Sequence, residues 1–241
     1  MKRQAHSLAH IQFAISGHGF GHIGQCAPII NLLTKNHPEI KISVRSEAPQ
    51  FKLREKLGDS VELQYAQLDI GMTQKDALSI DLDKSYQAYE ELHYDWSTKV
   101  QLEADILANQ NIDLIIANVP YLSLAAAKQA GIPCIAFCSL NWQEIYSYYF
   151  GNKNLAILNQ ISDAYHCADF FICPEPSMDM PNIGTRINVG PVAQTLSSPQ
   201  TLPITLKDNE KLVLISWGGM GLELDIDNWP EAKSIHFIVP D

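Results

Sequence analysis

The sequence lacks the long apolar runs that a membrane-spanning protein would need. No stretch approaches the ~20 consecutive apolar residues that cross a bilayer as a helix. The N-terminus, residues 1–6, is basic, but no apolar core of about 7–15 residues follows it to make a signal peptide. These two absences predict a chain with no transmembrane segment and a cytoplasmic location.

The number and spacing of the cysteines do not suit a metal site. The five cysteines are Cys26, Cys134, Cys138, Cys167 and Cys173. Four of them lie in apolar stretches, where Cys behaves as a small buried hydrophobe. No second Cys pair or Cys/His pair stands at zinc spacing from Cys134 and Cys138. We expect reduced thiols and no bound metal.

Basic residues are outnumbered, and one phosphate-binding motif is missing. The 241 residues carry 17 Lys and Arg against 27 Asp and Glu, a net charge of −10 at pH 7. A nucleic-acid binder would show a basic face, so the charge balance argues against this class. No Gly-x-x-x-x-Gly-Lys-Ser/Thr stretch occurs, so the sequence does not support a kinase. The length allows one large or two small domains with a real core.

A glycine-rich loop near the N-terminus organises the chain. Residues 11–15 are a short apolar run of the buried-strand type, and an apolar-periodic helix follows the loop. The loop contains Gly17, His18, Gly19, Gly21 and His22. Glycines let the backbone turn sharply, and the N–H groups of such a loop and helix N-terminus suit an anion, typically a phosphate. A turn needs neither histidine, so we interpret this loop as the floor of an active site.

Strands and helices alternate along the first 190 or so residues. Short apolar runs predict strands at 11–15, 40–44, 61–66, 113–117, 132–137 and 169–173, the third with the alternation of a half-exposed edge. Helical patterns cover 84–109, 123–130, closed by Gly131, and 155–167. Strands separated by helices imply right-handed crossovers, so we predict an α/β fold with a parallel sheet covered on both faces.

The composition changes after residue 193. Residues 194–210 are rich in Thr, Ser, Pro and Gln, as in a linker. A strand pattern at 211–217, a glycine turn and a possible strand at 235–239 then begin a second unit. We therefore predict a first domain over 1–193, a linker over 194–210 and an incomplete second domain over 211–241. We expect that the chain is truncated or that a partner supplies the rest, and that exposed apolar surface favours a homo-oligomer.

Four segments resemble known glycosyltransferases. The loop at 17–22 is similar to the loop of GT-B-fold glycosyltransferases, which ends in Gly-His. Residues 68–81, 131–146 and 211–219 resemble the glycosyltransferase-like N-terminal domain of L-arabinokinases. A more distant resemblance extends to UDP-glycosyltransferases and to the bacterial lipid II-forming GlcNAc transferase. The resemblance implies two facing Rossmann-like domains, of which the first holds the acceptor and the second binds the nucleotide-sugar.

The resemblance also implies an activity and two catalytic positions. It implies transfer of a sugar, of hexosyltransferase type, from a nucleotide-sugar to an acceptor hydroxyl, with no further cofactor. His22 falls where the related transferases keep their catalytic base, and Asn118 falls where they carry the Asp that holds this base. An Asn can orient an imidazole but cannot stabilise an imidazolium with a charge. The departure leaves open weak catalysis, a different arrangement of the base, and either stereochemical outcome.

Further polar residues fit a substrate-binding role. The candidates for substrate contact are Gly17, His18, Gly19, Gly21, Asp69, Gln74, Asp76, Asp81 and Trp142, and those for the donor diphosphate are Gly218, Gly219 and Gly221. The alternative for residues 69–81 is a solvated acidic loop in which Asp81 caps the next helix. The alternative for Trp142 is core packing instead of stacking on a sugar or base.

Two other functions fit parts of the sequence. Residues 19–24 satisfy the G-x-G-x-x-G dinucleotide pattern, and Arg45 and Glu47 at the end of the second strand fit NADP or NAD. That pattern requires neither histidine and predicts no second glycine turn, which counts against an NAD(P)-dependent oxidoreductase. Asn118 and the early end of the sequence instead fit a non-catalytic domain that binds a sugar or a partner.

The domain prediction has a measurable consequence for donor binding. Residues 1–241 alone should bind UDP-sugars weakly, because most of the donor pocket belongs to the second domain. Isothermal titration calorimetry of this chain with UDP-sugars checks the expectation, and micromolar affinity would contradict it.

Overall fold

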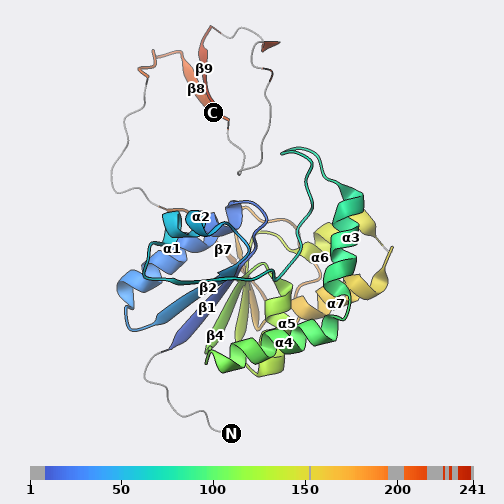
Figure 1. Ribbon diagram of the computed structural model, residues 1–241. Coiled ribbons are helices and arrows are strands. Elements are labelled where there is room, and N and C mark those ends of the chain that lie inside the picture. Colours follow the sequence, from blue (N-terminus) through green and yellow to red (C-terminus); the bar gives the residue numbers. More distant parts are fainter. Residues whose placement is uncertain are drawn as a thin grey trace.

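A seven-stranded parallel sheet forms the centre of the computed structural model, which describes residues 9–151, 153–194, 204–215, 225, 228–229 and 233–239 (Figure 1). The strand order is β3-β2-β1-β4-β5-β6-β7, and every neighbouring pair is parallel. The strands are β1 (His10–Ile15), β2 (Lys41–Ser46), β3 (Glu62–Tyr65), β4 (Leu114–Asn118), β5 (Cys134–Phe137), β6 (Phe170–Pro174) and β7 (Arg186–Val189). The predicted α/β fold is confirmed, and β3 lies at the edge as its alternating pattern indicated.

Helices cover both faces of this sheet (Figure 1). They are α1 (Gly21–Asn36), α2 (Gln50–Leu57), α3 (Leu82–His93), α4 (Trp96–Asn109), α5 (Tyr121–Ala130), α6 (Trp142–Phe150) and α7 (Leu155–Tyr165). Successive side chains of a strand point to opposite faces, so Phe13 and Ile15 pack with α1 and α2, whereas Ala14 packs with the core under α3 to α7. The sheet is therefore buried on both sides between two apolar cores.

The expected single helix over 84–109 is wrong. The structure has two helices, α3 and α4, separated at Tyr94 and Asp95, where Asp95 adopts a left-handed backbone with φ of 53°. The last carbonyls of a helix have no partner within it. Here the ammonium of Lys99 donates to the carbonyls of Glu91 and Leu92, at 2.5 and 2.7 Å. A lysine of the next helix thus satisfies two carbonyls at the end of α3, where the sequence carries neither Gly nor Pro.

Two other predicted helix ends are confirmed. Three secondary-structure elements were not predicted. Gly131 closes α5 with a left-handed φ of 67°, and the Asp81 side chain accepts a hydrogen bond from the Lys84 N–H at the start of α3. The sequence pattern did not reveal α2, α6 or β7. Of these, α2 is mainly polar and buries only Leu53 and Leu57, so it carries little apolar periodicity.

A second, two-stranded parallel sheet is formed by β8 (Lys211–Leu214) and β9 (Ile235–Ile238). Among the described residues, β8 shares no strand pairing with the seven-stranded sheet. Both strands occur where the sequence predicted the second unit, whereas the domain boundaries themselves stay a prediction. Within the described ranges, no helix combines the length and the apolar character needed to cross a membrane.

Candidate functional site

The glycine loop lies at the carboxyl ends of two central strands. β1 leads into the loop, and its neighbour β4 ends at Asn118, which is in register with Ile15. Ser16, the first residue after β1, donates its backbone N–H to the Asn118 carbonyl at 2.8 Å. The chain leaves β1 toward β2 and β3 and returns to β4 on the other side, so the strand order reverses here. Open α/β sheets bind ligands at such a switch point.

His22 and Asn118 meet at this point. His22 stands in the first turn of α1, is 6% exposed, and its Nδ1 lies 2.7 Å from Asn118 Oδ1. With the amide oxygen accepting, Nδ1 carries the proton and Nε2 keeps its lone pair. No described residue makes a hydrogen bond to Nε2. The pairing that the resemblance implied between these two side chains is therefore present as a contact.

The surroundings keep the His22 imidazole neutral. Burial lowers the pKa of His22 from its ordinary value, the hydrogen bond to Asn118 raises it in part, and the nearby His18 lowers it. A neutral imidazole at neutral pH is the form that can accept a proton. The electrostatics of the site thus suit a base more than a fixed cation.

Two residues that sequence reasoning missed extend this contact. The Asn118 Nδ2 group donates to Gln25 Oε1 at 3.1 Å, and Gln25 Nε2 donates to Ser139 Oγ at 2.9 Å. The Cys138 Sγ lies 3.7 Å from Gln25 Oε1, and burial raises the pKa of this thiol to about 12, so it stays protonated. A signal for Gln25 existed, because it follows His22 by three residues and so lies on the same helix face.

An aromatic and a carboxyl group pack beneath the loop. The rings of His18 and Trp142 meet edge to face, with centroids 5.3 Å apart. Trp142 Nε1 donates to Asp69 Oδ2 at 2.6 Å, and Ser16 also bonds this carboxylate. Trp142 and Asp69 are each 1% exposed. Burial of this kind favours the core alternative for Trp142, with Asp69 holding the indole in place.

Two glycines allow close packing around the glycine loop, one against Glu47 and one against His18. A Cβ added to Gly17 would stand 2.2 Å from Glu47 Cγ, and one added to Gly71 would stand 2.5 Å from the His18 ring. Gly19 has a φ of 73°, which favours glycine, while a Cβ on Gly21 would meet open space. The close approach at Gly71 joins the segment 68–81 to the glycine loop.

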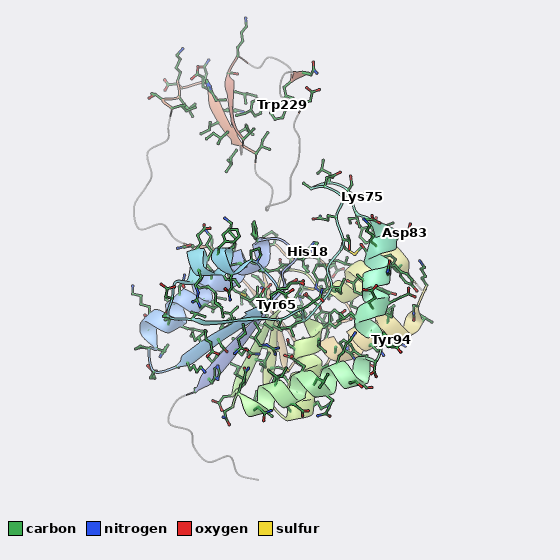
Figure 2. All side chains as sticks on the ribbon, viewed as in Figure 1. His18, Tyr65, Lys75, Asp83, Tyr94 and Trp229 are labelled. Atoms are coloured by element: carbon green, nitrogen blue, oxygen red, sulfur yellow. The ribbon has the colours of Figure 1, made fainter. Side chains whose placement is uncertain are left out.

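The other candidates of the acidic loop, residues 69–81, bond to residues near them in the sequence. Gln74 forms a backbone bridge with Ile80, and Asp76 accepts a hydrogen bond from the Leu78 N–H at 2.8 Å. Asp81 caps α3, which matches the alternative interpretation of this loop. Figure 2 shows Lys75 and Asp83, which lie beside these residues, well away from His18. Sugar contacts by Gln74, Asp76 and Asp81 stay predictions, and Gly218, Gly219 and Gly221 lie outside the described residues.

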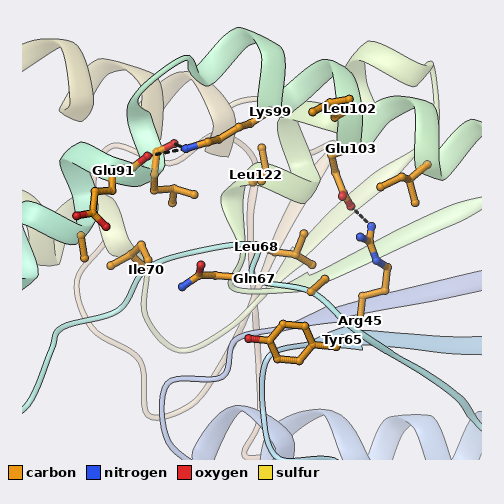
Figure 3. Close-up of a pocket in the computed structure, with 14 residues that line it drawn as sticks. Arg45, Tyr65, Gln67, Leu68, Ile70, Glu91, Lys99, Leu102, Glu103 and Leu122 are labelled. Carbon is orange, nitrogen blue, oxygen red and sulfur yellow. Dashed lines mark hydrogen bonds and ion pairs between the residues drawn. The ribbon is translucent and has the colours of Figure 1, made fainter.

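Arg45 and Glu47, the two candidates for contact with NADP or NAD, are bonded to other side chains of the protein. The Arg45 guanidinium forms a buried ion pair with Glu103 at one side of a cavity of about 460 Å³ (Figure 3). Glu47 is hydrogen-bonded to Gln67 and packs where a Cβ of Gly17 would be. The NAD(P) hypothesis required both side chains to face a ligand, whereas Arg45 is buried in an ion pair and Glu47 is half-buried beside Gly17. Among the described residues, no group of three His, Cys, Asp or Glu side chains is placed to hold a metal ion.

The buried carboxyl group of Asp69 makes the stability of the protein depend on pH. Burial raises its pKa from 3.8 to about 7, against the opposing hydrogen bonds of Trp142 and Ser16. Between these values the unfolded chain binds fewer protons than the folded one. The contribution of Asp69 to stability is therefore complete below about pH 4 and is lost as the pH rises through about 7, at a cost of about 4 kcal/mol.

We predict that Asp69→Asn removes this loss, because an amide can keep both hydrogen bonds without ionising. Urea unfolding at about pH 5 and about pH 8 measures the change in free energy of unfolding for each protein. Asp76→Asn, which changes an exposed loop carboxyl, is the matched control. Equal pH dependence in the wild-type protein and the Asp69→Asn variant would contradict the assignment.

The sequence has a curated relative that is much longer. Over 206 residues the chain is 27% identical to an L-arabinokinase of Arabidopsis thaliana, a match that covers 76% of this chain and 19% of that protein. The chain thus spans about a fifth of the length of this relative. No protein-family model matches the sequence.

Solved glycosyltransferases share the fold. The glycosyltransferase of kitacinnamycin superimposes with a TM-score of 0.57 at 11% identity, covering 95% of this chain and 70% of that one. UGT2 of Phytolacca americana, solved with UDP-2-fluoroglucose and pterostilbene, gives 0.52 at 13% identity, covering 91% of this chain and 62% of that one. CalG4, the calicheamicin glycosyltransferase, gives 0.51 at 13% identity, covering 86% and 57%. The chain therefore has the Rossmann-like fold of GT-B glycosyltransferases, as its resemblance implied.

Proposed function

We propose that this protein transfers a sugar from a nucleotide-sugar to an acceptor hydroxyl, with His22 as the general base. The observation that carries the proposal is the state of the His22 ring. Its Nδ1 is engaged by Asn118, and its Nε2 makes no hydrogen bond to any described residue. A general base needs one fixed nitrogen and one free lone pair, and this geometry supplies both.

The proposed reaction assigns a task to each part of the site. Nε2 of His22 takes the proton of the acceptor hydroxyl while its oxygen bonds to the anomeric carbon of the donor sugar. The bond to the nucleoside diphosphate breaks in the same step, and the leaving group takes the electron pair. N–H groups of the loop at 17–21 and of the first turn of α1 suit the negative charge of a diphosphate. Gly218, Gly219 and Gly221 remain proposed contacts to that group.

The Asn at position 118 sets the strength of the proposed base. Proton transfer makes His22 an imidazolium, which an Asp would stabilise by its charge and an Asn stabilises only by a hydrogen bond. The burial that lowers the pKa of His22 acts in the same direction. We therefore expect a working but slow base.

The relatives support the choice of a nucleotide-sugar donor. The Phytolacca americana enzyme was solved with UDP-2-fluoroglucose, and a Polygonum tinctorium relative, with a TM-score of 0.51 at 12% identity, is a UDP-glucosyltransferase. Since the chain covers 62% and 59% of these two proteins, the nature of the donor and of the acceptor is part of the proposal.

In a protein with a complete donor-binding domain, we predict that His22→Ala lowers sugar transfer by about 100-fold or more, the usual range for loss of a general base. Release of UDP from a UDP-sugar, measured with a panel of hydroxyl acceptors, reports the rate. His37→Ala, which removes an exposed histidine, is the control and should leave the rate unchanged.

Asn118→Asp is the complementary change. It supplies the missing charge, so we expect faster transfer in this variant if His22 is the base. Unchanged transfer in folded His22→Ala protein would remove His22 from the mechanism.

A further inference from the structure

A chain of four polar side chains runs from His22 to Ser139. Its links are His22 to Asn118 at 2.7 Å, Asn118 to Gln25 at 3.1 Å, and Gln25 to Ser139 at 2.9 Å. Asn118 is fully buried, whereas Gln25 and Ser139 are half-buried. The chain thus connects the imidazole to a hydroxyl near the surface.

The donors and acceptors of these three hydrogen bonds can all exchange roles with almost the same positions of the heavy atoms. An amide carries a donor and an acceptor of nearly equal size, and a hydroxyl can do either. In the direction that the structure shows, each amide nitrogen donates away from His22. In the reverse direction Ser139 donates to Gln25, Gln25 donates to Asn118, and Asn118 Nδ2 donates to His22 Nδ1.

The two directions give His22 opposite properties. When Asn118 accepts, the proton sits on Nδ1 and Nε2 can take a proton from a ligand. When Asn118 donates, Nδ1 holds the lone pair and Nε2 carries the proton, so His22 can only donate there. An Asp at position 118 would allow the first state alone, because a carboxylate only accepts.

We propose that Gln25 is a positioning residue that selects the tautomer of His22 by fixing the direction of this chain. The inference deepens the proposed function, and it rests on that function only for its catalytic meaning. The protonated Cys138 thiol lies 3.7 Å from Gln25 Oε1 and 3.8 Å from His22 Nδ1, so it can donate weakly to either and leaves the choice of direction to the amide of Gln25. The amide of Gln25 thereby keeps Asn118 Oδ1 turned toward His22. An Asp at position 118 would need no such partner, because both of its oxygens accept.

A ligand that binds the Ser139 hydroxyl can change the direction of these hydrogen bonds. A ligand oxygen that accepts the Ser139 proton leaves the lone pairs of this hydroxyl for Gln25 Nε2. That arrangement keeps Asn118 Oδ1 turned to His22 and so favours the tautomer that acts as a base. A ligand that donates to Ser139 favours the reverse direction instead.

The test is the tautomer of His22 in variants of Gln25, read from the ¹⁵N chemical shifts of its ring nitrogens. The full chain is labelled at histidine and held at a pH above the pKa of His22, and the His22 signals are identified by their loss in His22→Ala. In Gln25→Glu the new carboxylate can only accept, so Asn118 must donate to it. We expect the pattern of a ring protonated on Nδ1 alone.

Gln25→Met is the matched comparison, because its side chain has similar length and makes neither hydrogen bond. We expect its His22 shifts to move toward the pattern of a ring protonated on Nε2. Gln25→Lys, which can only donate, should give that reversed pattern fully and serves if the Met variant does not fold.

Identical His22 tautomers in the Glu variant and in the Met or Lys variant would overturn the inference. Loss of sugar transfer is not part of this readout. If the His22 tautomer responds to Gln25 but the protein transfers no sugar, the proposed function is wrong and this inference holds. If the protein transfers sugar but the tautomer does not respond to Gln25, the proposed function holds and this inference is wrong.

Discussion

The hydrogen bond between His22 Nδ1 and Asn118 Oδ1 is the contact on which the site depends. It exists because β1 and β4 are neighbours although about 100 residues of chain separate them, and because both end at the same edge of the sheet. Parallel pairing in register places Asn118 beside the loop that begins α1. The fold thus brings together one residue from the first turn of a helix and one from a strand end, and their contact decides which nitrogen of the imidazole carries the proton.

A buried layer beneath this contact holds the loop in place. Asp69 fixes the indole of Trp142, the indole meets the edge of His18, and His18 packs on Gly71. The carboxylate has lost nearly all its contact with water, which is why its pKa rises to about 7. Asp69, Gly71 and Trp142, which lie in segments that carried the resemblance to glycosyltransferases, therefore pack against the glycine loop as parts of its framework.

The sequence predicted those features that depend on local pattern and missed those that depend on tertiary contact. Apolar runs identified the parallel strands, and Gly131 and Asp81 marked helix ends, because each signal lies within a few residues. The ion pair of Arg45 needs Glu103, which lies 58 residues further along the chain. Such a partner cannot be recognised from its neighbours in the sequence. The break between α3 and α4 at Asp95 has neither Gly nor Pro to mark it. The resemblance located His22 and Asn118, whereas the hydrogen bonds of Gln25 to Asn118 and Ser139 emerged only from the structure.

The pKa of His22 tests the central contact most directly. A pH titration of the His22 ring by NMR should give a midpoint below 6.5 in the wild-type protein, because burial outweighs the hydrogen bond to Asn118. Replacing Asn118→Leu, which keeps the size and removes the bond, should lower the midpoint further. A wild-type midpoint at or above 6.5, or the same midpoint in both proteins, would contradict the account.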